Sequence, residues 1–170
     1  DIIQFDEPAF NVFFDDVNNW GIKCLERAIE GLKCETAVHI CYGYGIKANT
    51  DWKQTLGNEW RQYEEVFPKL QKSNIDIISL ECHNSRVPIE LLELIRGKKV
   101  MVGAIDVATT DIETPDEVAA TLREALKYVD ADKLYPCTNC GMAPLSRDVA
   151  TAKLSALSQG AEIVRAELGA

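Results

Sequence analysis

Apolar and polar residues follow two alternating patterns along this chain, short apolar runs and longer segments of helical period. The apolar runs are candidate strands at Ile2 to Phe5, Ala37 to Cys41, Ile75 to Leu80, Val100 to Ile105 and Lys133 to Tyr135. Most of them are rich in Val, Ile and Leu without strict alternation, which is typical of strands buried on both faces. We therefore expect a parallel sheet covered by helices.

Two of the intervening segments have long apolar stripes at helical spacing. One face of the first predicted helix consists of Val17, Trp20, Cys24, Ala28 and Leu32. The stripe of the second consists of Trp52, Leu56, Trp60, Tyr63 and Phe67. It reaches Pro68, a residue that kinks or ends a helix. Each stripe predicts one amphipathic helix packed against the sheet.

The next two helices are indicated by their end signals. A short helix is predicted from Pro88 to Ile95, ending near Gly97. Another begins at Thr114, with Pro115 at the first helical position and Glu117 two positions further on. Thr at the N-cap with Glu at N3 is the capping-box pattern, so the start of this helix is well defined.

A fifth helix is predicted from Arg147 to Leu168, with Ser146 as its N-cap. Gly160 is expected to be a weak point that costs roughly 1 kcal/mol relative to Ala. Strand and helix thus alternate five times, which indicates the α/β class. Two architectures share this order, a (β/α)8 TIM barrel and a doubly wound open sheet. The barrel is favoured, because no glycine-rich phosphate loop follows any candidate strand.

Polar residues suited to chemistry fall at the predicted strand ends, where barrels place their active sites. Asp6, His39, Glu81, Asp106 and Cys140 are separated by 33, 42, 25 and 34 residues. These intervals bracket the roughly 31 residues per unit of a barrel of about 250 residues. We predict that residues 1–170 supply the last five βα units of one catalytic TIM-barrel domain. The missing N-terminal strands would precede this chain and complete its pocket.

Composition narrows the class of protein. The chain is 46% hydrophobic, which is enough for a core, and its formal net charge of −9 argues against a nucleic-acid partner. No apolar run reaches the roughly 18 residues that a membrane span needs, and no secretory signal is recognisable. We therefore expect a cytoplasmic enzyme that acts on a small molecule, with no membrane partner. Its six cysteines should form no disulfide framework.

Four of these cysteines lie beside His, Glu or one another, whereas Cys24 and Cys34 are expected to be small buried hydrophobic residues. His39-Ile40-Cys41 ends a candidate strand, and residues i and i+2 of a strand share a face. An imidazole and a thiolate on one face could form half of a zinc site. A core histidine beside a buried cysteine is the alternative.

Glu81 closes a strongly apolar run, where a carboxylate is unfavourable unless a charge or a metal ion partners it. Glu81 could therefore supply an anionic oxygen ligand, although an ordinary polar residue at a strand end is the alternative. Strand alternation turns Cys82 away from Glu81.

Cys137 and Cys140 form a Cys-x-x-Cys pair, which can be half of a zinc site, a redox dithiol or a chance pattern. A redox dithiol would normally open a helix directly, but Gly141 and Pro144 intervene. Together, the three motifs place nitrogen, sulfur and oxygen donors at the ends of three strands. This combination predicts a metal site.

The same residues resemble the cobalamin-independent methionine synthase family, and the short "core" type most of all. Asp6-Glu7-Pro8-Ala9 is similar to the family's Asp-Glu-Pro-Ala strand. His39-Ile40-Cys41-Tyr42-Gly43 is similar to its His-x-Cys metal strand. Ser79-Leu80-Glu81 and Asn139-Cys140-Gly141 resemble the segments that supply a Glu ligand and the last Cys ligand. The similarity spans essentially the whole chain.

This resemblance implies a methyltransferase of TIM-barrel fold that holds zinc through His39, Cys41, Glu81 and Cys140. It also implies that Asp6 binds the amino group of homocysteine or methionine. Asp106 keeps its place in the catalytic site.

Two departures from the family pattern leave questions open. Ala108 stands where the larger members have a His that is thought to donate a proton. Cys137 is an additional cysteine, so the choice between Cys137 and Cys140 as ligand stays open. Both departures fit the short type, which lacks an N-terminal folate-binding barrel and leaves the methyl donor undefined.

The implied ligand set favours thiol chemistry. Zinc with two thiolates, a carboxylate and a neutral imidazole is too electron-rich to activate water well, yet it keeps a substrate thiol deprotonated and nucleophilic. Glu81 is the hardest donor of the set and the one that a thiol would displace. We therefore expect methyl transfer to the thiol of homocysteine, which forms methionine.

Three alternatives are considered. The first is a corrinoid- or coenzyme-dependent thiol methyltransferase of the same barrel type. The second is a non-catalytic zinc-binding domain, although structural sites usually draw ligands from closely spaced knuckles. The third is a zinc deaminase, which shares Pro-Cys-x-x-Cys but also needs His-x-Glu where this chain has His-x-Cys.

Overall fold

The computed structural model describes residues 1–44 and 47–169. Within them, five strands form one parallel sheet in the order β1-β2-β3-β4-β5. The strands are β1 (Ile2–Asp6), β2 (Glu35–His39), β3 (Ile77–Glu81), β4 (Lys99–Ile105) and β5 (Leu134–Thr138). Each predicted strand is confirmed, with its ends shifted by a few residues.

Helical segments connect these strands and follow the last one. They are η1 (Pro8–Asn11), α1 (Phe14–Asp16), η2 (Val17–Gly21), α2 (Ile22–Ile29), α3 (Lys47–Gln54), α4 (Tyr63–Leu70), η3 (Ile89–Ile95), α5 (Pro115–Ala125), η4 (Ala131–Lys133) and α6 (Arg147–Leu168). The short helix predicted from Pro88 is the 3-10 helix η3, with Pro88 at its N-cap. In the part of the chain that the structure describes, no helix combines the length and apolarity needed to cross a bilayer.

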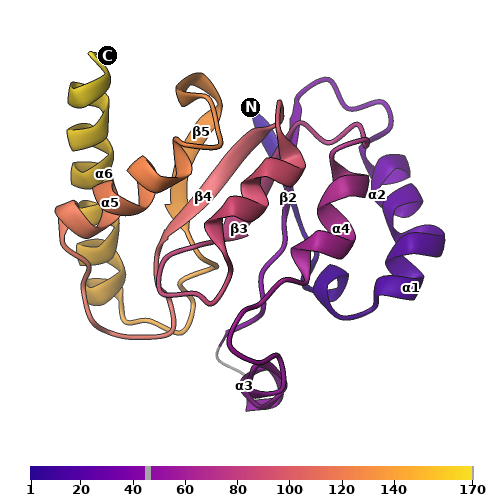
Figure 1. Ribbon diagram of the computed structural model, residues 1–170, viewed down its shortest axis with the longest axis horizontal. Coiled ribbons are helices and arrows are strands. Elements are labelled where there is room, and N and C mark those ends of the chain that lie inside the picture. Colours follow the sequence, from indigo (N-terminus) through magenta and orange to yellow (C-terminus); the bar gives the residue numbers. More distant parts are fainter. Residues whose placement is uncertain (45–46, 170) are drawn as a thin grey trace.

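Strand order distinguishes the two α/β architectures. A doubly wound sheet reverses its strand order at a switch point, whereas these strands follow chain order throughout. Figure 1 shows the helices following the sheet in the same order, from α2 beside the first strands to α6 beyond β5. The arrangement is a five-strand part of a TIM barrel, so the predicted fold class is confirmed.

The core lies between the sheet and the outer helices. Strand β3 is buried along its whole length, as are most of β2 and β4. Phe67 and Leu70 of α4 and Leu92 of η3 are fully buried in the same cluster. Burial on both faces explains why these strands lack alternation. Strand β1, by contrast, is mostly exposed along its edge of the sheet.

The two predicted helix caps are confirmed in detail. Thr114 Oγ1 accepts a hydrogen bond from Glu117 N, and the Glu117 carboxylate accepts one from Thr114 N, which completes a capping box at the start of α5. Ser146 Oγ accepts from Val149 N at the start of α6. A cap of this kind contributes about 1 kcal/mol, so both helices begin where the sequence indicates.

The prediction of one helix from Trp52 to Phe67 is wrong, because the stripe is divided between α3 and α4. Gly57 lies between them with a φ of +78°, a left-handed conformation that interrupts a helix. The aromatic side chains still pack together, but around Tyr42. Its ring centroid is 5.8 Å from that of Trp52 and 4.9 Å from that of Trp60.

The prediction that Cys24 and Cys34 are buried is also wrong. Cys24 is exposed and Cys34 is half-buried. The first helical region is divided into α1, η2 and α2, and it buries the face that contains Val17 and Leu25. Trp20 and Cys24 instead line a hollow on the surface. The apolar stripe correctly predicts a helical region, but it does not identify which face of that region is buried.

Gly160 is a close contact between helices, so the interpretation of this residue as a weak point is wrong. A Cβ added at position 160 would lie 2.5 Å from Val118 Cβ and 2.8 Å from Pro115 O. Only glycine allows α6 to approach α5 this closely. Packing between the two helices therefore offsets its low helix propensity.

Candidate metal centre

Strand register aligns polar residues at the carboxyl ends of three neighbouring strands. Asp6 of β1 pairs with His39 of β2, and His39 pairs with Ser79 of β3. The side chains of His39 and Ser79 meet, with Nδ1 2.9 Å from Oγ. This contact fixes the imidazole ring through Nδ1.

Three potential metal ligands converge beside this row. One ligand atom each from His39, Cys41 and Cys140 lies within 4.8 Å of the other two. His39 ends β2 and Cys41 follows it, whereas Cys140 lies beyond the end of β5. An imidazole nitrogen with two sulfurs is a donor set that suits zinc.

Two buried polar atoms in this region test whether the residues fit a metal ion. His39 Nε2 and Glu81 Oε1 have no hydrogen-bond partner among the described residues. Buried polar atoms nearly always have a partner. Both atoms are natural metal ligands, and the hydrogen bond between His39 Nδ1 and Ser79 Oγ is of the kind that orients a ligating histidine. The residues therefore fit a bound cation.

Glu81 lies outside the three-ligand group but next to it. Its side chain is fully buried, and Tyr44 Oη donates a hydrogen bond to Glu81 Oε2 at 2.5 Å. Burial raises the pKa of Glu81 to about 7, against the opposing effects of the Tyr44 hydrogen bond and Lys53. Because Ser79 and Glu81 are two positions apart on β3, they share a face. The role of Glu81 as the fourth ligand stays a prediction.

The thiol groups of Cys41 and Cys140 form a hydrogen bond with each other. Their sulfurs are 3.3 Å apart. The hydrogen bond from Cys41 lowers the pKa of Cys140, while the same contact and burial raise the pKa of Cys41. A divalent cation would replace this proton and hold both sulfurs as thiolates.

Cys137 lies apart from this sulfur pair. It is part of β5, and its Sγ is 3.9 Å from Ser79 Oγ. Burial raises its pKa to about 12, and it is not among the described residues whose ligand atoms converge with those of His39 and Cys41. Of the two cysteines that the sequence left open, Cys140 has the geometry of a ligand.

A cavity of about 480 Å³ opens at this end of the sheet. Its lining includes His39, Cys41, Cys140 and Asp6. Asp6 is exposed, and its Oδ1 accepts a hydrogen bond from Gln4 Nε2 at 2.8 Å.

Asp106 directly follows β4 at the carboxyl end of the sheet. It is 7% exposed, and it is not among the described residues that line the cavity. Its Oδ1 accepts from Ala108 N at 2.8 Å. The structure thus places Asp6 in the lining of the cavity and Asp106 outside that lining, and the functional roles of both stay predictions.

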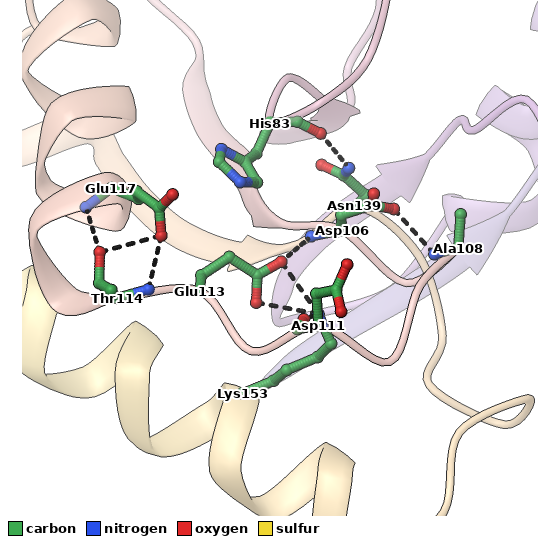
Figure 2. A network of polar contacts seen from close by, with 9 residues as sticks. All are labelled: His83, Asp106, Ala108, Asp111, Glu113, Thr114, Glu117, Asn139 and Lys153. Carbon is green, nitrogen blue, oxygen red and sulfur yellow. Dashed lines mark hydrogen bonds and ion pairs between the residues drawn. The ribbon is translucent and has the colours of Figure 1, made fainter.

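Asn139 fixes the segment that presents Cys140, a role that sequence reasoning missed. Its side chain accepts a hydrogen bond from Cys82 N at 3.2 Å. It also donates one to His83 O at 2.7 Å (Figure 2). A Cβ added at Gly103 would lie 2.4 Å from Asn139 Oδ1, so this packing requires glycine there. The available signal was a polar residue directly before a candidate ligand.

Ser79 and Tyr44 were also missed as supports of the candidate ligands. Ser79 precedes Glu81 by two positions, so strand alternation could have placed it on the ligand face. Tyr44 lies in a loop after β2, where no periodicity applies, and only the structure brings it to Glu81.

Fold and site together define a TIM-barrel protein whose candidate metal centre combines nitrogen and sulfur donors at the carboxyl ends of its strands. The sequence model of the family described as "Cobalamin-independent synthase, Catalytic domain" matches residues 1–163. The chain belongs to this family. Membership argues against the deaminase alternative.

Individual relatives support the assignment. A methionine synthase of Saccharolobus islandicus is 34% identical over 170 residues, which are 98% of this chain and 45% of that protein. A B12-independent methionine synthase from Shewanella sp. W3-18-1, solved in complex with selenomethionine, is 86% identical with a TM-score of 0.95. The match covers 99% of this chain and 49% of that one.

A methyltransferase from Methanosarcina mazei, at 19% identity and a TM-score of 0.57, supports the fold alone; the match covers 94% of this chain and 42% of that one. The chain spans about half the length of the curated relatives it matches.

Proposed function

We propose that this chain forms the zinc- and homocysteine-binding part of an enzyme that transfers a methyl group to homocysteine and forms methionine. The observation that carries the proposal is the convergence of His39, Cys41 and Cys140 within 4.8 Å, beside the buried and half-partnered carboxylate of Glu81. The names of the relatives agree with this activity.

Zinc would be held by His39 Nε2, the sulfurs of Cys41 and Cys140, and Glu81 Oε1. When bound, it would keep a substrate thiol deprotonated near neutral pH while leaving the sulfur nucleophilic. Ser79 fixes the ring of His39, and Tyr44 holds the second oxygen of Glu81. These contacts orient the ligands before a metal binds, as hydrogen bonds to metal-ligating side chains commonly do.

Asp6 is suited to bind the amino group of the amino-acid substrate. It is exposed at the cavity that His39 and the two cysteines line, and it pairs in register with His39. A carboxylate there would attract an ammonium group and hold the substrate thiol toward the ligands. The selenomethionine in the related Shewanella protein is of the same chemical class as the proposed product.

The transfer is a displacement at carbon. A sulfur–carbon bond forms between the substrate and the methyl group while the bond between the methyl group and its donor breaks. The electron pair of the broken bond leaves with the donor, and the thiol proton goes to solvent. The contribution of this chain is to bind, orient and deprotonate the substrate, so that the sulfur faces the methyl group in line.

We further propose that this chain is the C-terminal part of one catalytic domain and works with the rest of the barrel. Strand β1 leaves an edge of the sheet exposed, which further barrel strands would cover. The methyl donor would then bind across the two parts of the barrel.

A cytoplasmic location agrees with the chemistry of the cysteines. All six are free thiols in the described chain, and two of them are proposed metal ligands. Thiols persist in a reducing compartment.

The test combines zinc analysis with a methylation assay on the intact protein. We expect one zinc per chain and methionine formation from homocysteine, with a methylfolate and methylcobalamin offered as donors in separate arms. Cys41→Ser and Cys140→Ser should lose both zinc and homocysteine binding. Full zinc occupancy and unchanged binding in both variants would contradict the proposal.

A further inference from the structure

A buried ion pair joins α6 to the loop between β4 and α5. Lys153 belongs to α6 and is 0% exposed, and its Nζ contacts both carboxylate oxygens of Glu113 at 3.0 and 2.9 Å. Lys153 Nζ also donates to the backbone oxygen of Asp111. These contacts involve neither the candidate metal ligands nor Asp6.

The pair is connected directly to Asp106. Glu113 Oε1 accepts a hydrogen bond from the backbone N of Asp106 at 2.9 Å, and Asp106 Oδ1 accepts from Ala108 N at 2.8 Å. Figure 2 shows Lys153, Glu113 and Asp106 in this order, from α6 to the end of β4. The loop between β4 and α5 is therefore held at Asp106 by a charge that α6 neutralises.

Packing alone does not require such a pair. Two charges taken out of water are costly, and an apolar pair of similar volume is often as stable or more stable. A buried ion pair is useful to a protein when it fixes a backbone conformation that apolar side chains cannot fix. Here the fixed element is the backbone of Asp106, at the carboxyl end of the strand next to the one that ends in Glu81.

Asp106 directly follows β4, at the same end of the sheet as the candidate ligands. Burial and the charge of Glu81 raise the pKa of Tyr44, the residue that holds Glu81, and the charge of Asp106 adds to this effect. The Asp106 carboxylate, bound by Ala108 N through one oxygen, therefore lies within electrostatic range of Tyr44. A shift of its backbone would move this carboxylate relative to the substrate.

We propose that the buried Lys153–Glu113 pair positions Asp106 for binding the amino-acid substrate. This inference rests on the proposed function. Lys153 and Glu113 are positioning residues, because they touch Asp106 and its loop and do not reach the cavity.

Two double variants of the intact protein separate positioning from simple stability. Glu113→Gln with Lys153→Met removes both charges but keeps an oxygen that can accept from Asp106 N. Glu113→Leu with Lys153→Met removes the charges and the acceptor. Both are neutral replacements, so we expect both to fold with zinc content equal to wild type. The KM for homocysteine and the Kd for L-methionine should rise at least tenfold in the Leu variant and less than about threefold in the Gln variant.

A cycle with Asp106→Asn tests whether the effect passes through Asp106. If it does, the Leu double variant should have little further effect on methionine binding in the Asp106→Asn background. Fully additive losses would overturn the inference. Arg123→Ala is the matched control, because it breaks an exposed ion pair with Glu167 on the same helix α6 and should leave binding unchanged.

The outcomes also separate the two proposals. A wild-type protein that binds neither homocysteine nor methionine would overturn the proposed function and this inference with it. A wild-type protein that binds both, with equal affinities in the Gln and Leu double variants, would overturn the inference alone.

Discussion

Cys41 Sγ and Cys140 Sγ lie 3.3 Å apart, although the two residues are 99 positions apart in the chain. The contact exists because β2 and β5 are parallel strands whose carboxyl ends lie at the same end of the sheet, where the loops after them converge. Metal binding requires thiolates and releases protons, so a cation that replaces the proton between these sulfurs would bind both. This sulfur pair is the centre of the proposed zinc site.

The sulfur pair gives the first prediction, which separates Cys140 from Cys137. Cys140→Ser should bind less than a tenth of the zinc of the wild type, because a hard hydroxyl replaces one of the two soft donors. Cys137→Ser should keep its zinc, because Cys137 Sγ lies beside Ser79 and outside the ligand group of the described chain. Metal analysis after gel filtration measures both. Equal zinc loss in the two variants would contradict the assignment of Cys140.

The second prediction concerns the support of His39. Ser79→Ala removes the partner of His39 Nδ1, so the imidazole loses the contact that fixes its ring. Loss of such a contact typically lowers metal affinity about 10–100-fold. Competition with a chromophoric chelator would measure the change. Ser73→Ala makes the same chemical change at a buried serine that bonds to Leu70 O, and it should leave zinc affinity unaltered.

The third prediction concerns the contact between α5 and α6. Gly160→Ala places a methyl group 2.5 Å from Val118 Cβ, and overpacking of this kind costs roughly 1–3 kcal/mol. The free energy of unfolding should fall by that amount in a denaturant titration. In the background of Val118→Ala, where the clash is relieved, the same substitution should cost less. A Gly160→Ala variant as stable as the wild type would show that the helices do not cross this closely.

The sequence was sufficient to predict the strands because burial on both faces leaves a direct signal. Continuous apolar runs such as Ile77 to Leu80 occur in strands covered on both sides, and the caps at Thr114 and Ser146 are local interactions that need no tertiary information. The helices were less predictable. The Trp52 to Phe67 stripe has helical spacing, but Gly57 adopts a positive φ, and aromatic packing around Tyr42 satisfies the stripe without a continuous helix.

The residues of the site also differ in how well the sequence predicts them. His39, Cys41 and Cys140 could be identified as candidate ligands because their side chains have metal chemistry and lie at strand ends. Among the supports of the site, Ser79 could have been identified by strand alternation and Asn139 by its place directly before Cys140. Tyr44 could not, because it lies in a loop and its partner Glu81 is distant in the chain. In the sequence, Lys153 is one more polar residue of a long predicted helix. Only the fold brings it to Glu113, which in turn contacts Asp106.

The central claim is that one zinc ion is bound by the sulfurs of Cys41 and Cys140 together with His39 and Glu81, and that it accepts the thiol of homocysteine. X-ray absorption at the zinc edge of the intact protein, before and after addition of homocysteine, tests this most directly. The account predicts two sulfur neighbours at about 2.3 Å, with nitrogen and oxygen completing the shell, and a third sulfur when homocysteine is added. Fewer than two sulfurs before addition, or an unchanged shell after it, would contradict the account.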